Sequence, residues 1–340
     1  MARSGSKGSG MSMFRPRSSR SLALVVCLAA AGAALVAQQS GVIRVDVKLV
    51  HLIATVKNKS GQLVGALTKD DFEVYDNGVR QEIKVFERQT EQPLSVALLI
   101  DVSGSTAKDL KFELDSASRF LKALLSEGNP EDRVAIYKFD YEIMRVSPFT
   151  HDFVQLDARL KKISGTAGTA LYDAIYLAAS EMEGRQGRKV LIVISDGGNT
   201  TSHYDTHQAL EAAQLADAII YPVVVMPITN NAGRNIGGEN ALSFMAERTG
   251  GRTFLPNLGK QMDKAFDDII TELRTEYYMG FYPHDVPLTK DRFHTLKLQL
   301  KNPELQVSAR NGYYGDAEDG PAKPGDSPVA GTPGQTRKKR

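Results

Sequence analysis

Three oxygen-bearing side chains alternate in the stretch DVSGS, and together they suit the binding of a hard divalent cation. Asp101 supplies a carboxylate, and Ser103 and Ser105 supply two hydroxyls from the same short loop. Because one residue separates each from the next, a tight turn is able to direct all three toward a single point. Oxygen ligands of this kind suit Mg²⁺, Mn²⁺ or Ca²⁺ and are a poor set for zinc. The residues therefore indicate cation binding.

The elements around this loop predict an open α/β sheet. Residues 96–100 form a continuous apolar run, which is typical of a strand buried on both faces of a parallel sheet. Within 93–285, further apolar runs alternate with stretches of helical spacing, such as 110–124 and 260–277. This alternation predicts right-handed βαβ units and a Rossmann-like, doubly wound, mostly parallel sheet. Ligands bind such sheets at the carboxyl ends of the strands, where Asp101 is expected to lie.

The order of three motifs resembles that of the von Willebrand factor type A domain. That family carries Asp-x-Ser-x-Ser after an apolar strand, then a threonine in a glycine-rich loop, then an aspartate after another apolar strand. Here DVSGS is followed by Thr169 in GTAGTALYDAI and by Asp196 in VLIVISDGG. Thr166 competes with Thr169, but Thr169 directly follows Gly168 and opens a predicted helix, so it fits the pattern better. The resemblance covers roughly residues 93–285.

The resemblance implies a metal-ion-dependent adhesion site built from Asp101, Ser103, Ser105, Thr169 and Asp196. In the family, the serine and threonine hydroxyls bind the ion directly, and the carboxylates act mostly through water. The expected cofactor is Mg²⁺, or Mn²⁺ or Ca²⁺, and a protein partner supplies a Glu or Asp carboxylate to the ion. The flanking segments also resemble a group of secreted bacterial proteins known from acidobacteria. The expected function is cation-dependent protein–protein binding in adhesion or assembly.

Other interpretations of the same region stay open. The site could be vestigial in a structural scaffold, or it could serve a metal-assisted hydrolase. The chain shows no G-x-S-x-G elbow and no P-loop, and no histidine is tied by motif to Ser103 or Ser105, so we expect no enzyme. His203, Asp205 and His207 have a spacing that suggests zinc, but no further ligand cluster accompanies them, and Asp205 or Thr206 is a natural helix cap.

The segments on either side of the α/β region predict β structure. Residues 41–92 contain alternating apolar runs and the hairpin signal Asn77-Gly78, which together predict a small β module. Residues 286–315 also alternate and are expected to pack against that module. Residues 316–340 are rich in Gly, Pro, Ser and Lys and predict a disordered tail. The β module serves as a spacer or docking unit, or it simply packs on the α/β domain.

The start of the chain and its composition predict export. Residues 1–40 combine early arginines with a long apolar run and resemble a signal peptide or an N-terminal membrane anchor. The only cysteine, Cys27, lies in that run, so no disulfide framework is available. The formal net charge of +2 gives no reason to expect nucleic acid as a partner. We therefore expect a secreted or periplasmic protein, attached to a membrane only if the first segment is uncleaved.

Overall fold

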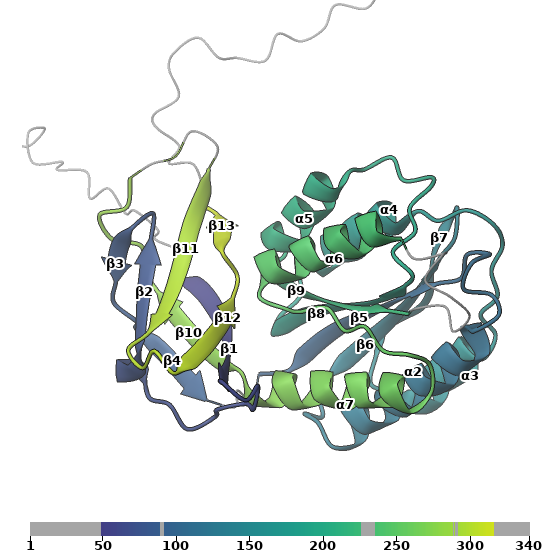
Figure 1. Cartoon of the computed structure of the whole chain (residues 1–340), viewed down its shortest axis with the longest axis horizontal. Coiled ribbons are helices and arrows are strands. Elements are labelled where there is room, and N and C mark those ends of the chain that lie inside the picture. The colour runs from purple at the N-terminus through teal and green to yellow at the C-terminus, as the bar shows by residue number, and fades with distance from the viewer. Residues whose placement is uncertain (1–48, 89–91, 226–234, 288, 290–291, 316–340) are drawn as a thin grey trace, which may run out of the picture. The chain divides into compact units, whose positions relative to one another are not determined.

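The computed structural model describes residues 49–88, 92–225, 235–287, 289 and 292–315. This part of the chain contains an α/β domain and a β-sandwich (Figure 1). The predicted export segment 1–40 and the predicted tail 316–340 lie outside the described residues. Within the described ranges, no helix is both long enough and apolar enough to span a membrane.

The α/β domain is built on a five-stranded sheet in the order β7-β6-β5-β8-β9. Its strands are β5 (Leu94–Asp101), β6 (Arg133–Phe139), β7 (Ile143–Thr150), β8 (Arg188–Ser195) and β9 (Ala218–Val224). Pairing is parallel except at the edge strand β7, which runs antiparallel to β6. Every residue of β5 is buried, as the apolar run 96–100 within it predicts. The mostly parallel, Rossmann-like sheet expected from the sequence is confirmed.

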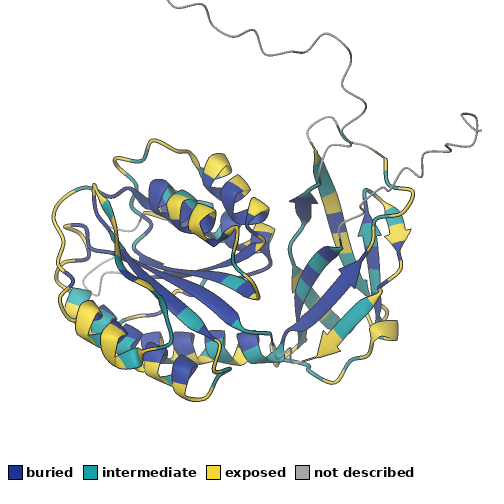
Figure 2. Ribbon diagram, turned by 180° about the vertical axis from the view of Figure 1, so that it is seen from behind, coloured by how far each residue is buried: buried dark blue, intermediate teal, exposed yellow. Residues whose placement is uncertain are grey.

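Helices cover both faces of this sheet (Figure 1). They are α2 (Leu110–Ser126), α3 (Phe153–Leu160), α4 (Leu171–Met182), α5 (Thr206–Leu215), α6 (Ile236–Thr249) and α7 (Lys260–Thr275). Side chains alternate across a strand, so Leu98 and Ile100 of β5 pack with α2, α3 and α7. Ala97 and Leu99 pack with α4, α5 and α6 on the other face. Figure 2 shows the buried strands between helices whose outer faces are exposed.

The β-sandwich consists of two four-stranded sheets, ordered β12-β1-β10-β4 and β13-β11-β2-β3. Its strands are β1 (Val50–Asn58), β2 (Phe72–Asp76), β3 (Val79–Gln81), β4 (Val85–Arg88), β10 (Tyr277–Phe281), β11 (Phe293–Leu300), β12 (Leu305–Ala309) and β13 (Gly312–Tyr314). Residues from both sheets, including Leu52, Val74, Tyr277 and Leu296, share one core. The sandwich therefore draws its strands from before and after the α/β domain.

The predicted hairpin at Asn77-Gly78 is confirmed, because these residues join β2 to β3 with Asp76 opposite Val79. Both central residues have positive φ angles, 45° for Asn77 and 83° for Gly78. A two-residue type I′ turn requires this conformation, which glycine adopts freely and asparagine adopts more readily than most residues. The local sequence thus fixes the register of the two strands.

The boundary between the two domains differs from the sequence prediction. The range 93–285 assigned to the α/β domain includes β10, whose Phe281 pairs with Val50 of β1. The sandwich therefore resumes at Tyr277, directly after α7. No glycine or proline separates the last turn of α7 from β10, so the sequence carries no turn signal at the point where the chain changes domain.

A second difference concerns residues 230–240, NNAGRNIGGEN, whose glycines and asparagines are typical of a loop. Helix α6 begins within it, at Ile236, in spite of two glycines in its first turn. The Asn235 side chain accepts a hydrogen bond from the Gly238 N–H at 3.0 Å, and this N-cap stabilises the helix start. Residues 226–234 lie outside the described residues.

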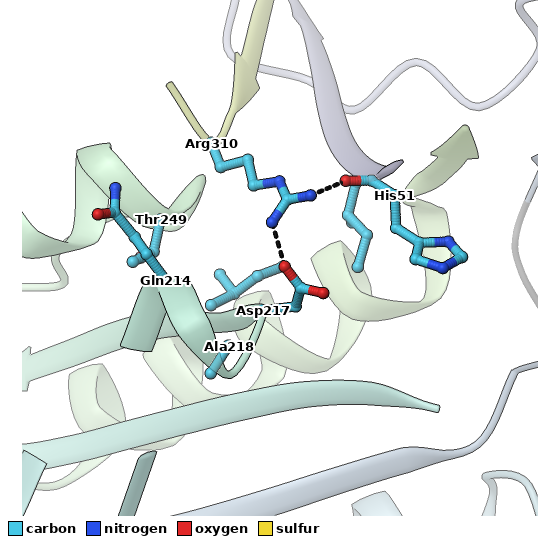
Figure 3. Close-up of a pocket in the computed structure, with 8 residues that line it drawn as sticks. His51, Gln214, Asp217, Ala218, Thr249 and Arg310 are labelled. Atoms are coloured by element: carbon cyan, nitrogen blue, oxygen red, sulfur yellow. Dashed lines mark hydrogen bonds and ion pairs between the residues drawn. The ribbon is translucent and has the colours of Figure 1, made fainter. Parts of the chain in front are cut away.

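Ion pairs join the sandwich to the α/β domain. Arg188 at the start of β8 donates to Glu276, which lies between α7 and β10, at 2.5 Å, and both side chains are 1% exposed. Arg310 of the sandwich donates to Asp217 of the α/β domain and to the backbone oxygen of His51, beside a cavity of about 30 Å³ (Figure 3). Such a cavity holds about one or two water molecules, so we assign it no ligand.

Candidate metal centre

The loop after β5 is held in place by Asp101, whose side chain is completely buried. Its Oδ1 accepts a hydrogen bond from the Ser103 N–H at 2.9 Å, and its Oδ2 accepts one from the Ser195 hydroxyl at 2.6 Å. The Thr106 hydroxyl donates to the backbone oxygens of Asp101 and Ser103 and closes the loop. Thr106 therefore braces the loop, whereas the N-cap position of α2 belongs to Asp109.

The hydroxyls of Ser103 and Ser105 lie 3.1 Å apart, within hydrogen-bond distance of each other. Ser103 is buried at 2% exposure, whereas Ser105 is exposed. The pair therefore forms a short row of oxygen atoms that runs from the buried end of β5 to the surface. Either hydroxyl is able to donate in this bond, so each keeps lone-pair capacity for another partner.

Thr169 and Asp196 meet where the loop before α4 contacts the loop after β8. A Cβ atom placed on Gly198 would lie 3.0 Å from Asp196 Oδ1 and 3.8 Å from Thr169 Oγ1, so both side chains border the same glycine. The Gly198 N–H donates to Asp196 Oδ1 at 2.8 Å. The N–H groups of Thr200 and Thr201 donate to the Thr169 carbonyl oxygen at 2.8 and 3.1 Å. The two loops form one hydrogen-bonded unit at the carboxyl edge of the sheet.

The competing threonine, Thr166, has a different partner. Its N–H and its hydroxyl both donate to Asp140 Oδ2, at 3.1 and 3.0 Å. Asp140 directly follows β6, so these bonds fasten the loop of Thr169 to the neighbouring strand end. Between the two threonines, Gly168 has a φ of 89°, and a Cβ there would lie 3.0 Å from the Cβ of Tyr141. These contacts favour Thr169 over Thr166 as the threonine of the candidate site.

The HYDTH stretch has structural partners. Asp173 of α4 accepts hydrogen bonds from the N–H groups of His203 and Tyr204, both at 2.8 Å, and lies 2.9 Å from His203 Nδ1. Asp205 accepts a bond from the His207 N–H at 2.8 Å as the N-cap of α5. The helix cap predicted at Asp205 is confirmed. The loop after β8 is thereby fastened to the start of both helices.

Two buried acidic side chains near this edge, Asp101 and Glu113, have no Lys or Arg partner in the described part of the chain. Burial raises the pKa of Asp101 to about 6, although hydrogen bonds from Ser103 and Ser195 lower it, and the charge of Asp196 adds to the rise. Burial likewise raises the pKa of Glu113, in the first turn of α2, to about 8, and repulsion from Asp101 and Asp196 contributes. Among the described residues, no Lys or Arg pairs with either buried carboxyl. A divalent cation would neutralise this excess of negative charge.

The donor set fits a hard cation. Among the described residues, no three His, Cys, Asp or Glu side chains gather into a metal cage, so an ion here depends on hydroxyls for its direct ligands. Ser103, Ser105 and Thr169 supply those hydroxyls, and Asp101 and Asp196 supply charge and orient their neighbours. Oxygen ligands alone suit Mg²⁺, Mn²⁺ or Ca²⁺.

Sequence reasoning missed Ser195 and Glu113. Ser195 is the last residue of β8, and a hydroxyl at a strand end directly before Asp196 is a signal of the same kind as DVSGS. Glu113 is spaced at i, i+4 and i+7 with Ala117 and Phe120 on the buried face of α2. A carboxylate within an apolar helical stripe is a second signal that the sequence contains.

Comparisons with known proteins point to one domain family. Residues 96–199 match the family profile described as von Willebrand factor type A domain. Over 128 residues, or 36% of this chain, the sequence is 26% identical to the minor fimbrium subunit Mfa5 of Porphyromonas gingivalis, and the match spans 10% of that protein's length.

Two solved structures are also similar to this chain. The conserved hypothetical protein BatB from Bacteroides thetaiotaomicron is 21% identical with a TM-score of 0.44, over 53% of this chain and 98% of that one. The von Willebrand factor domain of the type V pili tip protein Mfa5 from Porphyromonas gingivalis is 17% identical with a TM-score of 0.42, over 53% of this chain and 94% of that one.

Proposed function

Because this chain contains a von Willebrand factor type A domain, we propose that it binds a protein partner through a divalent cation at the carboxyl edge of the sheet, in adhesion or assembly. One observation carries the proposal: buried carboxylate and hydroxyl oxygens from separate loops lie at this edge without a Lys or Arg partner among the described residues. The similarity to a fimbrium subunit supports a role in surface assembly. The narrower relation to the acidobacterial group stays a prediction.

In this proposal the direct protein ligands of the ion are neutral, so its positive charge stays largely uncompensated until the partner binds. Ser103, Ser105 and Thr169 bind it through neutral hydroxyls, and Asp101 and Asp196 act through water. Neutral ligands leave the ion electrophilic, so a Glu or Asp carboxylate of the partner becomes a strong additional ligand. Binding of the partner then requires both the cation and an acidic residue.

Exposed apolar side chains support a protein as the partner. Of the ten large hydrophobic residues that are exposed in the described part of the chain, six lie at the carboxyl edge or in the first turn of a helix that leaves it: Phe112, Tyr141, Met144, Tyr204, Ile236 and Leu255. Aromatic and aliphatic anchors around a polar centre are typical of protein interfaces. The cavities lined by His51 and Arg310 and by Lys69 and Arg80 involve the sandwich, away from this edge.

The alternative of a metal-assisted hydrolase has less support. A nucleophilic serine needs a neighbouring general base. Ser103 and Ser105 contact each other, and among the described residues no histidine is hydrogen-bonded to either hydroxyl. His203 is bonded to Asp173, and its side chain is 90% exposed.

We also propose that the protein works outside the cytoplasm. Residues 1–40 have the composition of an export segment. The relative with 26% identity is a fimbrium subunit, which is consistent with that location. Detection of the protein in periplasmic or culture fractions, and its absence there after deletion of residues 1–40, tests this point.

Isothermal titration with Mg²⁺, Mn²⁺ and Ca²⁺ tests the cation site. We expect the wild-type protein to bind one ion, and Asp101→Asn and Ser105→Ala to weaken binding by about tenfold or more. Ser126→Ala, at the exposed far end of α2, is the matched control and should bind as the wild type does. If the folded wild-type protein binds none of the three ions, the metal-dependent function is wrong and a scaffold is favoured.

Peptide display separates protein binding from catalysis. Peptides retained on the immobilised protein in Mg²⁺ and released by EDTA should contain an Asp or Glu beside apolar residues. Ser105→Ala should retain few of them, and Ser126→Ala should retain them normally. Retained peptides that lack Asp and Glu, or peptides that EDTA does not release, contradict the proposal. Mg²⁺-dependent turnover of an ester or phosphoester probe favours the hydrolase.

A further inference from the structure

Helix α2 carries a glutamate at a position that the fold otherwise fills with apolar side chains. Glu113 lies one turn before Ala117 and two turns before Phe120, and it is 1% exposed. Further along the same face, Leu121 and Leu124 enter the core beneath β5. A stripe with this spacing faces the sheet. Glu113 therefore occupies the end of the stripe that is nearest in sequence to the DVSGS loop.

Neither carboxylate oxygen of Glu113 has a hydrogen-bond partner among the described residues. A buried polar group without a partner destabilises the folded state, and a charged one destabilises it more. A carboxylate in the first turn of a helix does gain from the helix dipole. An exposed carboxylate would have the same gain without the cost of burial, so helix stability does not explain this residue.

The charged groups that act on Glu113 are all acidic. After burial, the charges of Asp101, Asp109 and Asp196 are the causes that raise the pKa of the Glu113 carboxyl. In the described part of the chain, no Lys or Arg side chain offsets them. Asp101 and Asp196 belong to the proposed cation site, so the positive charge that balances Glu113 is the charge of an ion bound there.

We infer that Glu113 is a further residue of the cation site and that its buried, unpartnered carboxylate supplies a third negative charge to the bound ion. This inference rests on the function proposed above. With the ion bound, the carboxylate acquires a positive neighbour, and its free oxygens become acceptors for water held by the ion. Without the ion, the buried Glu113 carboxyl has only acidic groups near it, and their negative charges disfavour its ionised form. Glu113 thus favours the loaded state over the empty state.

The test compares two substitutions of Glu113 with one nearby control. Glu113→Gln keeps the size of the side chain but removes its charge, and Glu113→Met replaces the carboxyl with an apolar group of similar length. Asp115→Asn removes the same charge from an exposed position on the same helix. Mg²⁺ dissociation constants come from calorimetry, and melting temperatures are recorded in EDTA and in saturating Mg²⁺.

We expect Glu113→Gln and Glu113→Met to weaken Mg²⁺ binding by about 10- to 100-fold, as the loss of an outer carboxylate does at other metal sites. Glu113→Met should also melt at a higher temperature than the wild type in EDTA, because it removes a buried group without a partner. Asp115→Asn should leave the dissociation constant unchanged.

The outcomes separate this inference from the proposed function. If the wild-type protein binds Mg²⁺ and either folded Glu113 variant binds it equally well, the role of Glu113 is wrong and the cation site stands. If the wild-type protein binds no divalent cation, both proposals fail. If one of Glu113→Gln and Glu113→Met does not fold, the comparison uses the other. The two side chains differ in polarity, so the same packing defect need not unfold both.

Discussion

Buried carboxylates occur at both edges of the same sheet, but two of them at the carboxyl edge have no basic partner among the described residues. At the amino edge, Glu276 is paired with Arg188 at 2.5 Å, and both side chains are 1% exposed. At the carboxyl edge, Asp101 and Glu113 are buried without a Lys or Arg partner among the described residues. The fold neutralises Glu276 at the first edge and leaves Asp101 and Glu113 without a described countercharge at the second.

A second carboxylate at the amino edge follows the same rule. Asp132, completely buried before β6, accepts hydrogen bonds from the N–H groups of Leu94 and Asn129 at 2.7 and 3.0 Å. Arg274 of α7 adds an ion pair at 3.1 Å. A buried charge is tolerated when hydrogen bonds and an opposite charge surround it. The difference between the edges therefore indicates that the carboxyl edge is built for a ligand.

The largest effect on stability is expected from breaking the buried Arg188–Glu276 ion pair at the amino edge. Arg188→Met leaves Glu276 buried without its cation, which should cost about 3–5 kcal/mol of unfolding free energy. Urea denaturation measures the loss. Two nitrogens of Arg188 lack a partner among the described residues, so the double variant with Glu276→Leu should recover most of the stability. Added Mg²⁺ should stabilise the wild type and Arg188→Met by the same amount, so the difference between them should remain. A difference that Mg²⁺ removes would contradict the comparison.

The next effect is a pH dependence that belongs to the carboxyl edge. The pKa of Glu113 is raised from 4.5 to about 8 in the folded protein, and that of Asp101 is raised from 3.8 to about 6. At a pH between its unfolded and folded pKa values, each carboxyl is protonated in the folded state and ionised in the unfolded chain. The unfolding free energy therefore falls as pH rises through this interval. From about pH 5 to pH 8 in EDTA, Glu113 alone should account for a loss on the order of 3 kcal/mol.

Glu113→Met provides the control for this pH dependence. The variant should show a flatter profile in EDTA, because one of the two raised carboxyls is gone. Saturating Mg²⁺ should flatten the wild-type profile as well, since a bound cation favours the ionised carboxylates. A wild-type stability that is constant over this pH range would show that the edge does not hold protonated acids.

Cation binding itself should stabilise the fold by a smaller amount. An ion that binds only the folded state, present at a hundredfold its dissociation constant, contributes about 2.7 kcal/mol. Thermal melts in EDTA and in Mg²⁺, Mn²⁺ or Ca²⁺ measure it. Asp101→Asn should lose the gain, whereas Arg188→Met should keep it, because the amino edge does not contact the ion. A gain that survives Asp101→Asn would place the cation elsewhere.

Much of the α/β domain was predictable because its signals are local. The buried run of β5 and the polar residues that end it are adjacent in sequence, so the strand and its loop follow from periodicity and turn chemistry. The bond from Ser195 to Asp101 is different, because it joins residues 94 positions apart. It exists only once Ile194 of β8 stands opposite Ile100 of β5. Register of this kind is decided by tertiary packing.

The remaining misses have the same origin. The spacing of Glu113 marks it as buried, but its lack of partners depends on which groups the folded chain brings near it. Alternation predicts β structure from Tyr277 onward, but the range 93–285 left β10 in the α/β domain, because its pairing with β1 joins residues more than 200 positions apart. Local sequence predicts the type of each element. It does not predict which distant strand pairs with an element, or which distant charged groups lie beside a buried carboxyl.

The smallest effect tests whether the HYDTH loop belongs to the cation site or only holds the helix beside it. Asp205 caps α5 through the N–H groups of His207 and Gln208, so Asp205→Ala should cost about 1 kcal/mol in urea denaturation. Asp205→Asn retains an acceptor and should recover most of that loss. Because the carboxylate of Asp205 already has its partners, neither variant should change the Mg²⁺ dissociation constant. If both variants bind Mg²⁺ more weakly, the cation site includes this loop. The lack of basic partners for Asp101 and Glu113 would then not be enough to distinguish the carboxyl edge from the amino edge.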